Sequence, residues 1–230
     1  MDIEIIRLKI RNNIFLPLTK SIRRIKLKNK NFTIISNNCW GGTIYESYGI
    51  VKKSPTIGMF IMPEDYLIFI ANLEYYLTLP LEFIKPAQSK WKRQLESKDN
   101  WGTYVIGKIG NVELHMLHYH DEQSAKRKWE SRITRVNKNC LIVKFNDQNG
   151  ATIDHIKKFY ELPLKNKLCF VSCKKYQIND NVIFIKQPIR YAGQGIKASR
   201  EPFGKNKYID ITNYINKISE TTNNNNGGKL

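Results

Sequence analysis

A short apolar run that ends in a polar turn and two glycines most restricts how this chain can fold. Residues 32–35 are aromatic and β-branched, and such a run between polar residues predicts one buried strand. The sequence Ser-Asn-Asn at residues 36–38 favours a turn, because these side chains bond to nearby backbone. Cys-Trp-Gly-Gly at residues 39–42 then leads to a helix predicted within residues 43–50. A strand, a tight turn and a helix in this order are typical of an open α/β sheet, which places its chemistry outside the carboxyl ends of its strands.

Cys39 lies in this turn, at the position where a nucleophile would lie. The glycine pair after it permits positive φ or a close approach of the backbone to a ligand. Two interpretations stay open: Cys39 is a reactive thiol, or it is a small buried hydrophobic residue beside glycines that only make a turn. On the first interpretation, the candidates for substrate binding around the thiol are Asn37, Asn38, Trp40, Gly41, Gly42 and Tyr45.

Short apolar strands alternate with helices along the rest of the chain, which predicts a mainly parallel sheet covered on both faces. Residues 104–109 and 112–117 flank Gly-Asn and predict an antiparallel hairpin, either inserted or at the sheet edge. We expect one α/β domain over residues 31–219 and a disordered, low-complexity tail over residues 220–230. The other predicted strands are residues 57–62, 141–145, 168–172 and 182–185, and the other predicted helices are residues 63–80, 121–136, 153–162 and 209–218.

Residues 1–30 form a basic amphipathic segment, which Pro17 divides into two pieces. Apolar residues recur every three or four positions, with basic residues between them; the apolar ones are Ile3, Ile6, Ile10, Ile14, Leu18, Ile22 and Ile25. A basic amphipathic helix lies well on an anionic membrane, where each basic residue adds about 1 kcal/mol. The alternative is a helix that packs on the domain and keeps its charged face in water.

The charge of the chain favours a polyanionic partner. The sequence has 38 Lys and Arg residues against 20 Asp and Glu, for a formal net charge of +18. Nucleic acid, an anionic membrane face and a phosphorylated substrate all fit this excess. The aromatic residues fall mainly in predicted buried helices and no RNP, helix-turn-helix or OB pattern is evident, which argues against nucleic acid. No apolar run approaches the length of a membrane span.

The cysteines and histidines indicate neither a disulfide framework nor a metal site. The four cysteines form no CxxC pair and no secretory signal leads the chain, so we expect free thiols in a reducing, cytoplasmic compartment. His115, His118 and His120 lack a nearby cysteine pair at zinc-ligand spacing, so no metal is expected.

Cys39 with a histidine is the best catalytic pair in the sequence. A thiolate attacks an acyl carbon, and a neighbouring imidazole removes the proton and later protonates the leaving group. His118 and His120 lie at the end of a predicted strand, where either one could meet Cys39, although His118 equally fits a core histidine. A helix N-terminus beyond Gly42 would lower the pKa of the thiol and bind anions.

Three further residues are candidates for the site. Arg132 and Arg135 lie three apart on a predicted helix and can clamp a phosphate or a carboxylate, or form a solvated face. Asp147 ends a predicted strand and fits a base, an orienting carboxylate or a turn former. The motifs GxGxxG, Walker A, HExxH and GxSxG are absent, which weakens nucleotide-hydride, P-loop and standard hydrolase functions.

The stretch Ile-Ile-Ser-Asn-Asn-Cys-Trp-Gly-Gly at residues 34–42, with Tyr45 and Gly49 after it, resembles a bacterial family. That family is often labelled exopolysaccharide biosynthesis protein and is also catalogued as domain of unknown function 1919. Further matching pieces are Ser-Pro-Thr at residues 54–56 with Gly58, the helix over residues 65–76, and Lys-Trp-Glu-Ser-Arg at residues 128–132 with Arg135. The resemblance spans roughly residues 30–215, and it implies a three-layer α/β/α Rossmann-like fold and genes in capsule or lipopolysaccharide loci.

The first hypothesis for the function is a transferase of surface polysaccharide biosynthesis. Distantly similar capsule-locus enzymes place a cysteine after their first strand, use a nearby histidine and associate with coenzyme A. By that analogy the chain is an acyl (acetyl) transferase that uses coenzyme A or acetyl-CoA, with Cys39 and His118 or His120 as its pair. The alternatives are a glycosyltransferase or phospho-sugar transferase that takes a sugar nucleotide, and a non-catalytic scaffold of the assembly complex. Residues 1–30 would hold the chain on the inner face of the cytoplasmic membrane, near a lipid-linked glycan.

Overall fold

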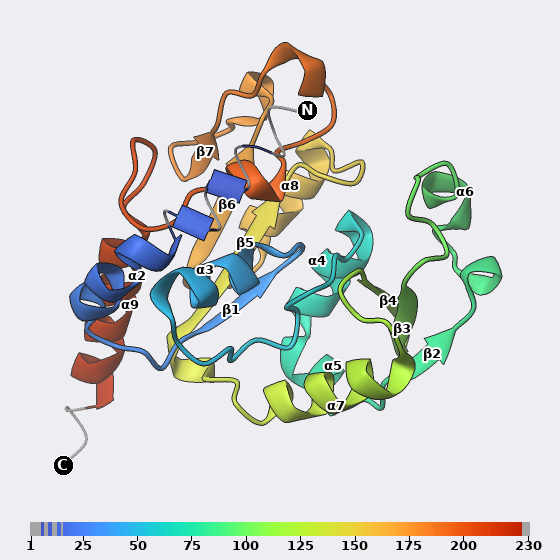
Figure 1. The fold of residues 1–230 in the computed structure, drawn as a ribbon, viewed down its shortest axis with the longest axis horizontal. Coiled ribbons are helices and arrows are strands. Elements are labelled where there is room, and N and C mark those ends of the chain that lie inside the picture. Colours follow the sequence, from blue (N-terminus) through green and yellow to red (C-terminus); the bar gives the residue numbers. More distant parts are fainter. Residues whose placement is uncertain (1–5, 7–8, 11–12, 15, 227–230) are drawn as a thin grey trace.

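A four-stranded parallel sheet and a separate three-stranded antiparallel sheet form the framework of the protein (Figure 1). The structure, a computed structural model, describes residues 6, 9–10, 13–14 and 16–226. The parallel sheet has the order β1-β5-β6-β7, from β1 (Thr33–Ser36), β5 (Leu141–Asn146), β6 (Lys167–Val171) and β7 (Val182–Phe184). The antiparallel sheet has the order β2-β3-β4, from β2 (Glu82–Ile84), β3 (Val105–Ile109) and β4 (Val112–Met116).

Helices cover both faces of the parallel sheet, which confirms the predicted α/β fold. On one face, Phe145 of β5 stacks on Tyr66 of α4 at 5.7 Å and on Phe159 of α8 at 5.5 Å between ring centroids. On the other face, Trp40 of α3 meets Phe170 of β6 edge-on at 5.4 Å. The helices are α2 (Leu16–Lys26), α3 (Trp40–Tyr48), α4 (Pro63–Ala71), α5 (Leu73–Thr78), α6 (Lys92–Leu95), α7 (Glu122–Ile133), α8 (Ile153–Glu161) and α9 (Ile211–Asn226).

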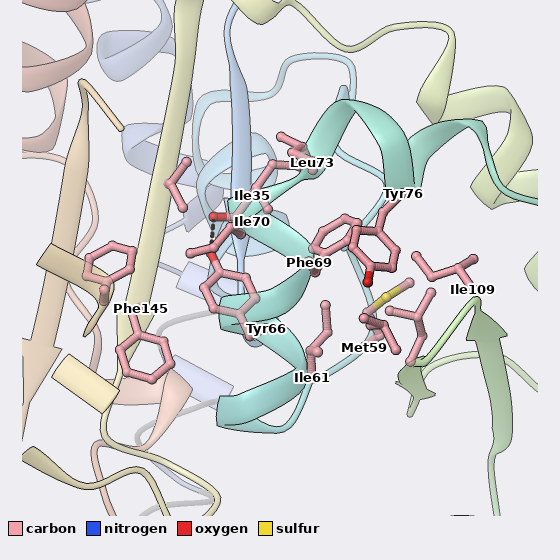
Figure 2. Close-up of a cluster of buried hydrophobic side chains, with 14 of the residues drawn as sticks. Ile35, Met59, Ile61, Tyr66, Phe69, Ile70, Leu73, Tyr76, Ile109 and Phe145 are labelled. Atoms are coloured by element: carbon pink, nitrogen blue, oxygen red, sulfur yellow. Dashed lines mark hydrogen bonds between the residues drawn. The ribbon is translucent and has the colours of Figure 1, made fainter. Parts of the chain in front are cut away.

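Helix α4 joins the two sheets through a large apolar cluster, part of which Figure 2 shows. The hydroxyl of Tyr66 lies 2.8 Å from the carbonyl oxygens of both Ile35 and Lys144, so α4 is fixed across β1 and β5. Phe69 of α4 and Tyr76 of α5 belong to the same cluster and lie on the side of the antiparallel sheet, near Ile109 (Figure 2). Pro63 opens α4 at a position where a missing N–H costs nothing, and Glu64 favours the positive end of the helix.

The predicted hairpin exists, but not at the edge of the parallel sheet. β3 and β4 pair antiparallel, as expected from Gly110-Asn111, and β2 adds a third strand next to β3. The two strands are thus part of a second sheet inserted between β1 and β5. The predicted strand at residues 57–62 is a turn followed by a single bridge between Phe60 and His115, because Gly58 takes φ 83° and ends any extended run.

Two helix boundaries differ from the sequence prediction. The helix expected over residues 63–80 is divided at Asn72, whose φ of −130° ends α4 before α5 begins. The terminal helix α9 continues to Asn226, so much of the tail expected to be disordered is helical, and residues 227–230 lie outside the described part. Buried Ile211, Ile215 and Ile218 anchor this helix at spacings of four and three.

The amino-terminal segment is described continuously from residue 16 onward and at residues 6, 9–10 and 13–14 before it. Helix α2 starts at Leu16 and holds Pro17 in its first turn, where proline is tolerated. Positions 1–5, 7–8, 11–12 and 15 lie outside the described residues, and Ile3 of the predicted apolar residues is among them. Among the described helices, none has both the length and the apolar character that crossing a membrane requires.

Candidate active site at the start of helix α3

Cys39 follows β1 and is the N-cap residue of α3. The turn before it is held by side chains: Ser36 Oγ donates to the Asn38 carbonyl at 2.7 Å and accepts the Gly41 N–H at 3.3 Å. The Trp40 N–H donates to Asn38 Oδ1 at 3.1 Å. Within the described residues, the N–H of Gly42 makes no hydrogen bond, and Gly42 lines a pocket beside Cys39. The start of α3 therefore offers a free donor next to a thiol.

Helix α3 begins at Trp40, three residues earlier than the sequence predicts, and its two glycines serve close packing and not a positive φ. Gly41 and Gly42 belong to the first turn of α3 and do not take positive φ. A Cβ on Gly41 would lie 3.2 Å from Ser36 Oγ, and one on Gly42 would lie 3.1 Å from a methyl carbon of Ile57. The glycines thus let α3 approach β1 and the segment after the helix closely.

The pocket has a volume of about 490 Å³ and draws its walls from four parts of the chain. These parts are the first turns of α3, the segment 52–58, the turn after β4 together with α7, and residues 198–199. The lining residues are Cys39, Gly42, Thr43, Glu46, Lys52, Ile57, Gly58, His118, Tyr119, Lys128, Arg132, Ala198 and Ser199. A half-buried thiol, an imidazole and several cations therefore share one opening.

Positive charge dominates this pocket. Lys52, Lys128 and Arg132 line it against one acid, Glu46, which pairs with Lys52 at 2.5 Å. Lys128 and Arg132 lie four residues apart on α7, so one helix face presents both cations. After the Glu46–Lys52 pair is set aside, two positive charges remain for a ligand. The pocket favours an anionic ligand, such as one that carries phosphate groups.

Arg132 is held in place from one side. Its Nη1 donates to the Ile57 carbonyl at 3.1 Å and to the Tyr119 hydroxyl at 2.5 Å. The Tyr119 hydroxyl itself donates to the same Ile57 carbonyl at 2.6 Å. Lys128 Nζ lies 5.4 Å from the centre of the Tyr119 ring, within cation–π range. Lys128 and Arg132 form the cationic wall of the pocket, and these contacts hold it in place before a ligand binds.

The two candidate histidines lie in different places. β4 ends at Met116, so His118 and His120 follow the strand in a turn. The backbone N–H of His118 donates to the Gly58 carbonyl at 3.0 Å, and its exposed side chain lines the pocket that holds Cys39. His120 is exposed and does not line the pocket. The structure therefore places His118, and not His120, in the pocket that Cys39 lines.

The environment of Cys39 keeps its thiol protonated. Burial, reinforced by the nearby Glu201 carboxylate, raises the pKa of Cys39 to about 11, against the opposing effect of Lys144. The thiol lies 3.7 Å from the Met59 carbonyl and donates to it. At neutral pH only about one molecule in ten thousand then carries a thiolate. Burial therefore opposes the lowering of this pKa that was expected from the helix N-terminus.

Four of the predicted binding residues belong to the interior behind the pocket. Trp40 is fully buried, and its indole N–H donates to the Pro202 carbonyl at 2.7 Å. Tyr45 is also fully buried, and its hydroxyl donates to the Phe32 carbonyl at 3.0 Å. Asn37 and Gly41 are buried under the turn as well. None of these four lines the pocket.

Asn38 belongs to a buried polar network next to the site. Its amide donates to Glu201 Oε2 at 3.0 Å and its oxygen accepts from Lys144 Nζ at 3.0 Å. Lys144 Nζ also donates to Glu201 Oε1, and neither side chain is exposed. Asn146 Nδ2 donates to the same Glu201 oxygen at 2.8 Å. The network fastens the segment that carries Ser199 onto the carboxyl ends of β1 and β5.

Asp147 and Arg135 act outside the pocket. The Asp147 carboxylate accepts the Ser172 N–H at 2.7 Å, the Ser172 hydroxyl at 2.9 Å and the Ile196 N–H at 2.7 Å. It therefore anchors the end of β6 and the segment 188–207. Arg135 follows the end of α7, where Nη2 donates to Ser131 Oγ at 2.6 Å, and it does not line the pocket.

Four residues of the pocket were not predicted from the sequence: Lys52, Lys128, Glu46 and Tyr119. A spacing of four between Lys128 and Arg132 was a usable signal for a shared helix face. No local pattern indicated Lys52 or Tyr119, because the fold brings them to the site from distant segments. Among the described residues, no group of three or more His, Cys, Asp or Glu side chains could hold a metal ion.

Comparison with known proteins gives a family match that covers most of the chain. Residues 10–219 match the family described as "Domain of unknown function (DUF1919)". A protein of Haemophilus influenzae (strain ATCC 51907 / DSM 11121 / KW20 / Rd), called "Uncharacterized protein", is 30% identical over 198 residues, which cover 86% of this chain and 88% of that protein. The matched range includes all the residues that line the pocket. The chain therefore belongs to the family of domain of unknown function 1919.

Proposed function

We propose that the pocket is the active site of a transferase of bacterial surface polysaccharide biosynthesis, most concretely an acyl (acetyl) transferase. The observation that carries the proposal is that the thiol of Cys39 and the imidazole of His118 line one pocket with Lys128 and Arg132. A nucleophile, a base and an anion-binding wall are the parts that acyl transfer from a phosphate-bearing donor requires.

The cationic wall fits a donor such as acetyl-CoA. Lys128 and Arg132 would hold its phosphates, and the bound donor would supply an acyl group activated as a thioester. The pocket volume of about 490 Å³ suits part of such a molecule, with the remainder outside the pocket.

The residues of the chain would divide the transfer as follows. His118 accepts the proton of the Cys39 thiol as Sγ bonds to the acyl carbon, and the free N–H of Gly42 stabilises the negative oxygen that forms. His118 then returns the proton to the departing thiolate of the donor, which leaves an acyl group on Cys39. A hydroxyl of the glycan acceptor next loses its proton to His118 and bonds to the acyl carbon. The bond to Sγ breaks, and Sγ takes the proton back.

A glycosyltransferase or phospho-sugar transferase is the second candidate, and the high pKa of Cys39 favours it. A thiol whose pKa is raised to about 11 is a poor resting nucleophile. In this case the Cys39 thiol is structural and holds the Met59 carbonyl. Lys128 and Arg132 would then bind the diphosphate of a sugar nucleotide.

Mass spectrometry of the protein after incubation with acetyl-CoA tests the first candidate. We expect one acetyl group on the peptide that contains Cys39 in wild type and none in Cys39→Ser. Cys173→Ser is the matched control, because Cys173 is also a half-buried free thiol and lies outside the pocket. Its acetylation at Cys39 should equal wild type.

The acceptor in this proposal is a glycan or a lipid-linked glycan precursor at the cytoplasmic side of the membrane. Transfer to such an acceptor should fall at least a hundredfold in His118→Asn, as expected for loss of a general base. Unchanged turnover in Cys39→Ser with a sugar nucleotide would establish the second candidate. Polymer synthesis that survives a Cys39→Ala/His118→Ala double substitution would indicate a scaffold.

A further inference from the structure

Helix α2 exposes its apolar residues to solvent. Leu18 is 72% exposed, Ile22 54% and Ile25 83%, and Ile14 just before the helix is 50% exposed. At 3.6 residues per turn Leu18, Ile22 and Ile25 fall within an arc of about 60°. A helix on the surface of a domain normally turns such a stripe toward the core. In α2 the stripe faces outward.

The opposite side of α2 contacts the domain through a charged residue. Arg23 Nε donates to the Ser47 carbonyl of α3 at 2.8 Å, and its guanidinium lies 5.3 Å from the centre of the Phe203 ring. Position 23 lies about 100° or more around the helix from each of the apolar positions. Arg23 is thus directed inward while the leucine and isoleucines are directed outward.

The carboxyl end of α2 is fixed by α9. Asn216 Nδ2 donates to the Lys26 carbonyl at 2.9 Å, and Asn216 Oδ1 accepts the Lys28 N–H at 2.9 Å. Figure 1 shows the two helices side by side, α2 in blue and α9 in red. Rotating α2 to bury its apolar stripe would break these bonds and the Arg23–Ser47 bond. The outward direction of the stripe is therefore built into the fold.

Two basic residues flank the stripe. α2 contains Lys20, Arg23, Arg24 and Lys26 and no acidic residue. Lys26 lies about 40° beyond Ile22 around the helix and Arg24 about 100° from Ile25 on the other side, and both are exposed. An apolar stripe with cations along its sides matches the interface of an anionic bilayer, where the apolar side chains enter the acyl boundary and the cations meet the lipid phosphates. A two-fold contact with a second copy would instead bring two such cationic helices together, which is unfavourable.

We propose that α2 is an interfacial helix that docks the protein on the surface of an anionic membrane through Leu18, Ile22 and Ile25. This docking is independent of the transfer chemistry of the pocket. It agrees with the proposed acceptor, because α2 packs on α3, the helix whose first turns line the pocket.

Co-sedimentation of the full chain with vesicles tests the docking. We expect binding to vesicles of phosphatidylglycerol and phosphatidylcholine that weakens as salt rises, and at least tenfold weaker binding to pure phosphatidylcholine. Leu18→Ser/Ile22→Ser/Ile25→Ser should weaken binding to the anionic vesicles at least tenfold. These side chains are mostly exposed, so the fold should survive, and the circular dichroism spectrum checks this.

Two matched controls test whether binding depends on the residues of α2 in particular. One removes exposed apolar side chains elsewhere, and the other reverses charges elsewhere. Val51→Ser/Tyr75→Ser/Ile189→Ser removes side chains that are 61%, 60% and 92% exposed, and it should bind like wild type. Arg24→Glu/Lys26→Glu should weaken binding at least tenfold, since each basic residue near an anionic surface is worth roughly fivefold. The reversal of two exposed lysines elsewhere, in Lys98→Glu/Lys126→Glu, should weaken it much less.

Equal loss of binding in the stripe variant and its control would overturn the proposal. So would binding that ignores lipid charge. A dimer in analytical ultracentrifugation that disappears only in the triple serine variant, without vesicle binding by wild type, would show that a second copy covers the stripe. Failure of acetyl transfer would leave the docking proposal intact, and failure of docking would leave the pocket intact.

Discussion

Replacing Glu201 with glutamine removes one charge from a pair that lies entirely inside the protein. Lys144 and Glu201 are both unexposed, and Glu201 accepts from Lys144, Asn38 and Asn146. The substitution would keep the size of the side chain and an acceptor oxygen, but it would leave the Lys144 ammonium without a counter-charge. Breaking a buried ion pair from one side costs about 3–5 kcal/mol. We expect Glu201→Gln to lose that much free energy of unfolding.

A double-mutant cycle measures the pair itself. Lys144→Met should cost a similar amount, because it leaves the Glu201 carboxylate buried and unpaired. The double variant Lys144→Met/Glu201→Gln should recover most of the loss, since neither charge then remains. Equilibrium urea unfolding at pH 7 gives the four free energies, and the coupling energy should exceed about 2 kcal/mol.

A cost below about 1 kcal/mol for each single variant, or a double variant that loses the sum of the two singles, would contradict a buried ion pair. Either result would mean that the two side chains do not form a charged pair in the folded protein. A third variant, Lys28→Met, is a matched control, because Lys28 pairs with Glu220 at 2.6 Å on the surface. It should change stability by less than about 1 kcal/mol.

Three further predictions concern pH, backbone conformation and thiol reactivity. Burial lowers the pKa of His115 to about 3. Between pH 6.5 and 3 the imidazole is therefore protonated in the unfolded chain and neutral in the folded one, so the free energy of unfolding should decrease as the pH is lowered through this range. Between pH 7 and pH 5 the loss should be about 2 kcal/mol greater in wild type than in His115→Phe, measured by urea unfolding; equal losses would contradict the assignment. Gly195→Ala places a Cβ 2.2 Å from the Asp147 carbonyl oxygen at φ 71° and should lower the unfolding free energy by more than about 2 kcal/mol. Gly193→Ala, at φ 76° with open space, should cost only about 1 kcal/mol, and similar losses would argue against the close contact. Alkylation of Cys39 by iodoacetamide should accelerate about tenfold per pH unit from pH 7 to pH 9, and a rate that levels off near pH 8 would contradict its high pKa.

The strands of the parallel sheet could be predicted because their signals are local. The run predicted at residues 141–145 is β5, Leu141–Asn146, and the run at 168–172 is β6, Lys167–Val171. In both, nearly every side chain is buried, which gives a continuous apolar pattern. Lys144 and Asn146 are the polar residues of β5, and the distant Glu201, which bonds to both, explains why a lysine is buried there.

The start of α3 could not be predicted, because packing decided it against helix propensity. Gly41 and Gly42 are poor helix formers, so the sequence favoured a later start. The structure begins the helix at Trp40, and the two glycines let its first turn pack closely against Ser36 and Ile57. The same packing buries Trp40, which reads as a binding residue in the sequence and belongs to the core.

Three of the predicted site residues lie together in the structure. Cys39, His118 and Arg132 line one pocket, and each lies at or near the end of a recognisable element. Lys52 comes from an irregular segment that no periodicity marks. Asp147 carries a strand-end signal, yet its three hydrogen bonds to Ser172 and Ile196 make it an anchor for loops.

Calorimetric titration of the pocket with phosphate-bearing donors tests the central claim most directly. The ligands are acetyl-CoA, coenzyme A and UDP-, GDP- and CMP-sugars, each titrated into wild type, Lys128→Gln/Arg132→Gln and the control Lys98→Gln/Lys126→Gln. We predict that acetyl-CoA or coenzyme A binds to wild type and to the control, and at least tenfold more weakly to Lys128→Gln/Arg132→Gln. Binding of a sugar nucleotide with no binding of coenzyme A would contradict the acyl-transfer mechanism, and no binding of any donor would contradict the assignment of the pocket as a transferase site.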